Sequence, residues 1–198
     1  MKRLWSLVIV AVMSSTAFAQ AKQEKPLTMV HDEERGIIMM KPKDEKWEIK
    51  KGGEGAKVFT GGSALVSHRL DLFTIEVVTS VKEDNQTFGT LKEVVDKTIT
   101  NFENDKDGKP IPDRKIIKRK NEESKFPGAG NPKAWFLDMA IDEKGNKTPI
   151  RIWTFLCEKD KNKLVRVSIF GADDLYKKYE KDVNYVCATL QTYKVKKK

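Results

Sequence analysis

The sequence predicts an α+β domain in which an antiparallel β-sheet with a meander is covered by helices. Residues 131–170 contain three runs rich in β-branched and aromatic side chains, separated by two turn sequences, which predicts a three-stranded meander. Residues 173–193 repeat apolar side chains at three- and four-residue steps, as in an amphipathic helix. A second helix with a capping motif is expected from residue 91.

The first residues indicate export. Lys2 and Arg3 precede an apolar run over residues 4–13, and the small residues Ala17 and Ala19 flank Phe18. A basic start, a short apolar segment and this triplet are typical of a bacterial secretory signal with cleavage after Ala19. The alternative is an uncleaved membrane anchor, but the apolar run is short for a span. We therefore expect a periplasmic or secreted protein with no transmembrane span after signal removal.

The 198 residues suffice for one ordinary domain. We divide the chain into a signal peptide (1–19), a polar, flexible leader (20–34), a single α+β domain (35–193) and a basic tail (194–198). Early strands are expected over residues 36–49 and 64–78, with glycine-rich turns between them.

The charge is concentrated outside the predicted domain. The net charge of +9 falls to +3 once the two basic residues of the signal and the four lysines of the tail are set aside. This distribution argues against a dedicated nucleic-acid binder, whose basic residues cluster on the folded surface. Lys194, Lys196, Lys197 and Lys198 could contact an anionic surface or simply keep the end of the chain solvated.

Two elements precede the meander. Thr90 and Glu93 form the two ends of a capping box, and apolar residues recur at helical spacing from Leu91 to Phe102, which predicts a helix to about residue 103. Residues 114–120 are rich in basic side chains and predict an edge strand, because such charges discourage aggregation at a sheet edge.

Centring the first meander turn between Lys144 and Gly145 places Phe136 opposite Trp153 and Asp138 opposite Arg151. Alternation then separates two faces. An apolar core face is expected from Trp135, Leu137, Met139, Ile141, Ile150, Ile152, Leu156, Val165, Val167 and Ile169. A mixed face is expected from Phe136, Asp138, Arg151, Trp153, Phe155, Cys157, Arg166, Ser168 and Phe170.

The mixed face is the candidate binding surface, defined by Phe136, Asp138, Arg151, Trp153 and Arg166. Its charged groups and rings could hold a small ligand or serve an enzyme. The alternative is a cross-strand ion pair beside an aromatic pair, which stabilises many sheets. Complete burial under the closing helix would leave a ligand no entrance.

The chain has two cysteines, Cys157 and Cys187. In an oxidising compartment they are expected to form one disulfide between the second meander strand and the closing helix. The alternative is two separately buried thiols. Neither has a neighbouring histidine or second cysteine, so metal and catalytic roles have no support.

No serine, histidine and acid are spaced as in a known nucleophile arrangement, and the glycine-rich segments match no phosphate-binding or dinucleotide motif. The sequence thus offers no specific argument for an enzyme, a cofactor or a metal.

The order of elements resembles that of the PsbP-like sandwich family, which includes periplasmic DcrB-type proteins. The residues that carry the resemblance are the strand, proline and tryptophan of 36–47, the helix of 91–102, the strand pair of 150–170 and the helix of 175–193. The leader and the glycine-rich hairpin at 52–62 depart from it. The resemblance implies an α/β/α sandwich and a non-catalytic extracytoplasmic module that binds an unknown protein or envelope component. The alternatives are a small-ligand protein or enzyme using the mixed face, and an anionic-surface binder using the tail.

Overall fold

A computed structural model describes residues 29–32, 36–51, 63–82, 88–157 and 160–193. Its elements in chain order are β1 (Met29–Asp32), β2 (Ile37–Met40), β3 (Trp47–Lys51), β4 (Ser63–His68), β5 (Thr74–Val81), α1 (Leu91–Glu103), β6 (Arg114–Lys125), β7 (Lys133–Glu143), β8 (Asn146–Cys157), β9 (Asp160–Phe170), α2 (Asp173–Lys178), α3 (Glu180–Thr189) and β10 (Gln191–Thr192). The signal peptide, Ala19, the leader up to residue 28 and the tail lie outside the described residues. The prediction that the leader is flexible up to residue 34 is wrong for Met29–Asp32, which form strand β1 through pairing with β2.

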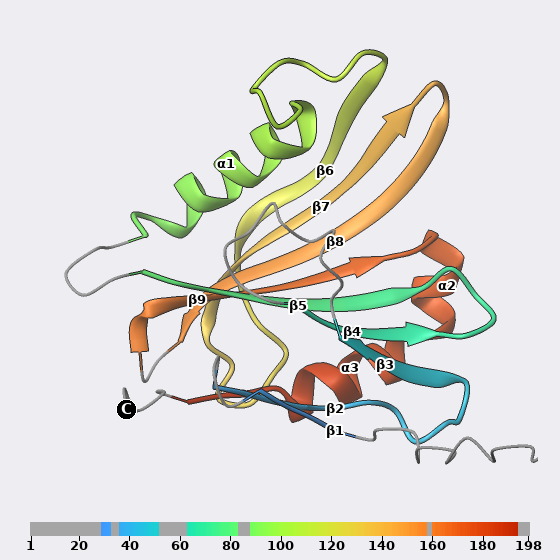
Figure 1. The fold of residues 1–198 in the computed structure, drawn as a ribbon, viewed down its shortest axis with the longest axis vertical. Helices are drawn as coiled ribbons and strands as arrows, with labels where there is room; N and C mark the ends of the chain where they lie inside the picture. Colours follow the sequence, from blue (N-terminus) through green and yellow to red (C-terminus); the bar gives the residue numbers. More distant parts are fainter. Residues whose placement is uncertain (1–28, 33–35, 52–62, 83–87, 158–159, 194–198) are drawn as a thin grey trace, which may run out of the picture.

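Seven strands form one antiparallel sheet in the order β3-β4-β5-β9-β8-β7-β6. Two meanders, β3-β4-β5 and β6-β7-β8-β9, meet where β5 pairs with β9. The α+β prediction is confirmed, and β6 is an edge strand as expected. A small second sheet has the order β1-β2-β10 and lies below the large one (Figure 1).

The predicted hairpin between β7 and β8 is confirmed residue by residue. Phe136 pairs with Trp153 and Asp138 with Arg151. The two turn residues, Lys144 and Gly145, both have positive φ, at 54° and 88°. This is the geometry of a type I′ turn, whose twist matches that of the strands it joins.

The predicted face of β9 is wrong by one residue. Ile152 pairs with Ser168 and Trp153 with Val167, so Val165, Val167 and Ile169 lie on the mixed face. Arg166, Ser168 and Phe170 lie on the face of Leu137. Across the first turn, odd-numbered residues of β7 pair with even-numbered residues of β8. Across the second turn, even-numbered residues of β8 pair with even-numbered residues of β9. The face of β9 therefore cannot be predicted by assuming that the second turn has the same parity as the first.

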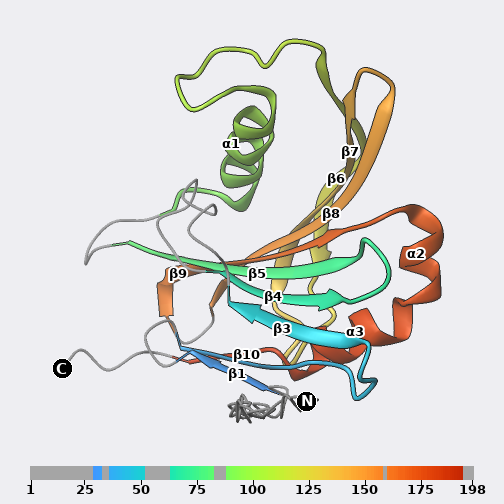
Figure 2. The same ribbon diagram turned by 45° about the vertical axis from the view of Figure 1, so that its right-hand side comes forward.

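Helices cover both faces of the sheet, as predicted. The helix α1 lies on one side, and α2 and α3 on the other (Figures 1 and 2). Under α1, Val95 and Ile99 pack with Leu137, Met139, Ile150 and Ile152. Under α3, Val183, Val186 and Cys187 join a larger core with Trp153, Phe155, Val165 and Val167.

The helix α1 starts where the capping box predicts. The Thr90 side chain accepts a hydrogen bond from the Glu93 backbone N–H at 3.2 Å, and Glu93 Oε2 accepts one from the Thr90 N–H at 2.7 Å. These two bonds satisfy backbone donors that the first helical turn leaves without partners.

The closing helix is not continuous, which corrects the prediction of one helix to residue 193. It breaks at Tyr179, whose backbone leaves the helical region at φ −104°, ψ 14°. The Tyr179 hydroxyl donates to Asp71 and lies 3.2 Å from His68 Nε2, which ties the break to the β4–β5 turn. After Thr189 the chain is extended and joins β2 as β10. Tertiary contacts therefore override the helical spacing of Leu190 and Tyr193.

No helix among the described residues is long and apolar enough to cross a membrane.

Candidate functional site

Four of the five residues of the predicted binding surface come together on the sheet face under α2. Phe136 and Trp153 pack with ring centroids 4.7 Å apart. Arg151 Nε lies 3.7 Å from Asp138 Oδ2, an ion pair across neighbouring strands. The fifth, Arg166, lies on the opposite face, because of the pairing of β9.

Two residues that the sequence did not suggest complete an ionic network. Asp173, at the start of α2, accepts hydrogen bonds from Arg119 at 2.7 Å and from Arg151 at 2.5 Å. Arg119 also lies 3.9 Å from Asp138. The hydrogen bond from Arg119, then that from Arg151, holds the pKa of Asp173 below its ordinary value.

A β-bulge explains the position of Arg119. The pairing of β6 with β7 shifts between Lys118 and Lys120, so Arg119 is the extra residue of the edge strand. Bulges redirect side chains and increase the local twist. No sequence signal marks this bulge, since the surrounding residues are uniformly basic.

The central pair of this network is largely closed off from solvent, whereas Arg119 and Asp173 are partly exposed. The Asp138 and Arg151 side chains are 14% and 13% exposed, and the Arg151 guanidinium lies 3.9 Å above the Tyr176 ring. Each charge of the network has an opposite charge within the chain. The geometry favours the stabilising interpretation of this surface over the ligand-binding one.

Arg166 is isolated from the other predicted site residues. Burial lowers its pKa to about 10, an effect that the charge of Glu76 opposes. It belongs to the interior of the opposite face and contributes nothing to the surface around Asp138.

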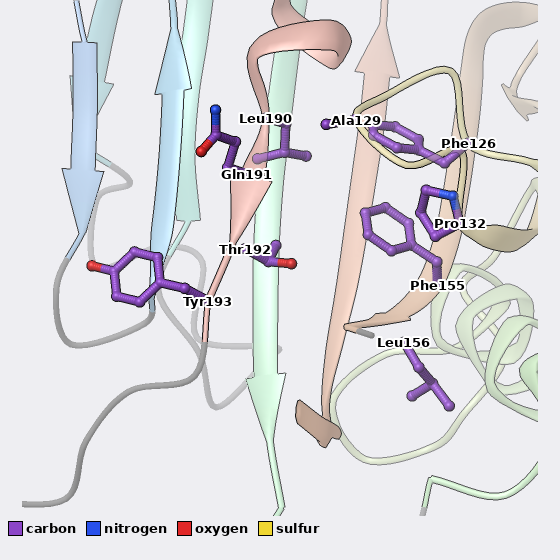
Figure 3. A pocket seen from close by; sticks show the side chains of 9 residues that line it. All are labelled: Phe126, Ala129, Pro132, Phe155, Leu156, Leu190, Gln191, Thr192 and Tyr193. Carbon is purple, nitrogen blue, oxygen red and sulfur yellow. The ribbon is translucent and has the colours of Figure 1, made fainter. Parts of the chain in front are cut away.

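An open pocket lies at the other end of the meander and is the candidate functional site (Figure 3). Its volume is about 260 Å³. The lining residues are Phe126, Ala129, Pro132, Phe155, Leu156, Leu190, Gln191, Thr192 and Tyr193. Phe126 and Phe155 are buried and their stacked rings lie 4.6 Å apart, so this aromatic pair gives the pocket an apolar side.

One wall of the pocket is the strand β10. Gln191 and Thr192 pair with Ile38 and Ile37, and the Tyr193 N–H donates to Gly36 O at 3.0 Å. Figure 3 shows β10 with β2 on one side and with Ala129, Pro132 and Phe155 on the other. The buried Lys163 ammonium donates to Gly36 O and Tyr193 O, each at 3.1 Å, and so fastens this strand to the large sheet.

The predicted disulfide is wrong, because Cys157 and Cys187 are both free and buried. Cys157 accepts a hydrogen bond from Thr192 Oγ1 at 3.1 Å beside the pocket. Cys187 packs in the core under α3, where burial raises its pKa to about 12. The prediction assumed that Cys187, on the closing helix, lies against the end of the second meander strand, whereas Cys187 packs in the core under α3 and Cys157 lies beside Thr192 of β10.

Sequence reasoning did not find the pocket. Residues 126–132 read as a connecting loop, and residues 190–193 as the last turn of a helix. Since β10 exists only through its pairing with β2, no local pattern predicts the wall that it forms. In the part of the chain that the structure describes, no group of acidic, histidine and cysteine side chains is arranged to hold a metal ion.

Comparison with known proteins identifies the fold. No protein-family model matches the chain, and no curated protein sequence matches it. The structure is similar to that of cyanobacterial PsbP (CyanoP) from Synechocystis sp. PCC 6803, with a TM-score of 0.59 and 15% identity over 85% of this chain and 93% of that one. It is also similar to LpqN of Mycobacterium tuberculosis, a protein involved in cell envelope biogenesis, with a TM-score of 0.51 and 13% identity over 84% of this chain and 90% of that one.

The similarity covers nearly the whole described domain, and its low sequence identity limits it to architecture. An antiparallel seven-stranded sheet with α1 on one face and α2 and α3 on the other, matched to both proteins, shows that this chain has the PsbP-like fold.

Proposed function

We propose that this chain is an exported, non-catalytic binding module of the cell envelope that engages a partner through the pocket beside β10. The observation that carries the proposal is an open pocket of about 260 Å³ next to a strand edge, lined by aromatic and aliphatic side chains and by polar groups of β10. Concave sites with an apolar lining and a few polar groups are where proteins commonly bind ligands. A cavity of about 150 Å³ already admits benzene, so this one has room for a large apolar side chain.

Two further arguments support an envelope role. The first residues have the composition of a secretory signal. The fold is shared with LpqN, which is involved in cell envelope biogenesis. At 13% identity this likeness supports the proposal through architecture alone.

Export is tested by expressing the full chain in a bacterial host and fractionating the cells. We expect the protein in the periplasm or medium, with Gln20 as its first residue by mass spectrometry. An Ala19→Leu variant should keep its signal peptide, because signal cleavage requires a small residue there. Retention of the unmodified chain in the cytoplasm would contradict this part of the proposal.

Partner binding is tested by site-specific photo-crosslinking in the native envelope. A photoreactive residue at Gln191, on the exposed rim of the pocket, should form adducts that the same residue at Asn184, exposed on α3, does not. Ala129→Trp, which fills the pocket from its exposed rim, should abolish the adducts at Gln191. Equal crosslinking at both positions, or no effect of Ala129→Trp, would contradict a role for the pocket.

A second candidate function concerns the tail, which lies outside the described residues. Four of its five residues are lysines, which favours contact with an anionic surface. Binding to vesicles of anionic lipid should then weaken as salt rises, because screening shortens the range of the attraction. If a chain ending at Tyr193 binds the vesicles as well as the full chain, the tail has no such role.

A further inference from the structure

The geometry points to an extended peptide as the ligand of the pocket: the peptide pairs with the free edge of β10 and places one large apolar side chain against Phe126 and Phe155. This inference rests on the proposed function, since it names the class of partner for the same pocket. Such binding requires a free backbone edge, an apolar anchor site beside it and polar groups that a peptide can satisfy but a lipid chain cannot.

The free edge follows from the pairing of β10. In an antiparallel ladder, the backbone groups of successive residues point to opposite sides of the strand. The Tyr193 N–H points to Gly36 of β2, so the N–H and C=O of Thr192 point away from β2. Among the described strands, β10 is the last of its sheet, and no further strand pairs with this side.

The anchor site lies on that same side of β10. Ala129, Pro132 and Phe155 lie across the pocket from β10 (Figure 3), and Phe126 stacks on Phe155. A peptide added to a sheet edge gains affinity from backbone hydrogen bonds and specificity from pockets for its side chains. The edge and the pocket together meet both requirements.

The polar backbone of this wall distinguishes a peptide from an acyl chain. A hydrocarbon chain in the pocket would cover the Thr192 N–H and C=O and leave them without hydrogen bonds, which is unfavourable for buried polar groups. An extended peptide satisfies both groups while it fills the apolar space. The observations therefore favour a peptide.

The sequence that follows Tyr193 favours an acidic peptide. Tyr193 lines the pocket, and the following residues 194–198 carry four lysines. Five residues reach at most about 18 Å from Tyr193 when fully extended. Acidic side chains flanking the apolar anchor would thus lie within range of the lysine ammonium groups.

The test uses the full mature chain and a short fluorescent peptide of alternating threonine and valine, with one central phenylalanine and glutamates at both ends. Fluorescence polarisation measures its Kd. We expect replacement of the phenylalanine by alanine, or N-methylation of the backbone beside it, to weaken binding about tenfold or more, since each change removes an anchor or an edge hydrogen bond.

Two protein variants measure the contribution of the β10 backbone edge to peptide binding separately from that of the pocket. Thr192→Pro removes the N–H that points away from β2 and keeps the ladder to β2, because proline is tolerated on an edge strand with its N–H side outward. Its matched control, Thr192→Val, keeps the N–H and removes the hydroxyl that bonds Cys157. We expect about tenfold weaker binding for Thr192→Pro and little change for Thr192→Val, with unaltered thermal unfolding showing that both variants are folded.

Binding of decanoate, measured on the same protein, distinguishes failure of this inference from failure of the proposed function. If decanoate binds, Ala129→Trp blocks it and the peptide does not bind, the pocket is a lipid site and the peptide inference is overturned. Equal peptide binding by wild type and Thr192→Pro, or by the N-methylated peptide, overturns it as well. If neither probe binds and the crosslinks at Gln191 are absent, the proposed function fails too.

Discussion

At the scale of single residues, the network around Asp138 shows why charged groups on a sheet face do not by themselves make a ligand site. Asp138 lies nearly buried between Arg151 and Arg119, and both arginines also bind Asp173. A carboxylate in this position is costly to leave without a partner, whereas a paired one fixes the helix α2 to the sheet. The cost of disrupting the network should therefore depend on which arginine is removed.

We expect Arg151→Met to lower the free energy of unfolding by about 2 to 4 kcal/mol, because it leaves the Asp138 carboxylate with only a distant, partly exposed guanidinium. Arg119→Met should cost less than about 1 kcal/mol, because Arg119 is 32% exposed and the Arg151 pair remains. Urea unfolding followed by tryptophan fluorescence measures both. Equal losses would show that Arg151 has no special role.

The same network predicts a pH dependence. Because the pKa of Asp173 is lower in the folded chain, the unfolded chain binds more protons as the pH falls below about 3.9, the ordinary aspartate value. The contribution of Asp173 is present above that pH and is lost as the pH falls through the folded pKa. Urea midpoints measured from pH 7 to below pH 4 should fall less steeply for Asp173→Asn than for wild type. A parallel pair of curves would contradict this.

The cysteines give a further prediction at this scale. Both thiols are buried, and the pKa of Cys187 is raised to about 12, so neither should react with iodoacetamide at neutral pH in the folded protein. In denaturant without reductant, both should react. Mass spectrometry reads the number of labels. Protection that persists in denaturant and disappears only after reduction would show that the disulfide forms after all.

At the scale of elements, local signals predict what local interactions determine. The capping box at Thr90 places the start of α1, and the turn at Lys144 and Gly145 fixes the register of β7 and β8, because each depends on residues adjacent in sequence. The face of β9, the bulge at Arg119 and the strand β10 depend on partners distant in sequence. Those features could not be predicted from the sequence, because they depend on which strands pair in the folded sheet.

The cap itself can be tested. Thr90→Ala should destabilise the protein by about 1 kcal/mol, because the Glu93 N–H loses its acceptor at the helix start. Thr90→Ser retains the hydroxyl and is the matched control. Urea unfolding measures both variants. A loss in Thr90→Ser as large as that in Thr90→Ala would assign the effect to the threonine methyl group instead of the cap.

At the scale of the whole molecule, the sandwich was predictable because both faces of the meander are apolar, yet the division of its core was not. The two sets of alternating side chains of β9 lie on the opposite faces from those predicted. The larger core therefore lies on the face that was expected to be partly polar. The ionic network there occupies the end near α2, and the buried Lys163 lies at the other end beside β10. The space between them is filled by aromatic and aliphatic side chains under α3. The candidate site then lies at the opposite end, where the pairing of β10 leaves a pocket.

This division predicts that the two helical layers open separately. The helix α1 buries only Val95, Thr98 and Ile99, whereas α3 contributes Val183, Val186 and Cys187 to a core that also includes Trp153 and the central strands. Regions with few buried apolar contacts open at lower free energy than the core of a domain. In native-state hydrogen exchange followed by mass spectrometry, the amides of α1 should exchange faster than those of β7, β8 and α3.

Two substitutions of the same kind distinguish local from global opening. Val95→Ala should accelerate exchange in α1 and leave β8 and α3 nearly unchanged, because the Val95 side chain packs only within the smaller core. Val186→Ala should accelerate exchange in every protected segment, since a cavity in the larger core lowers the stability of the whole domain. If Val95→Ala accelerates β8 and α3 as much as α1, the two layers unfold as one unit, and the sheet couples its faces more tightly than their separate cores imply.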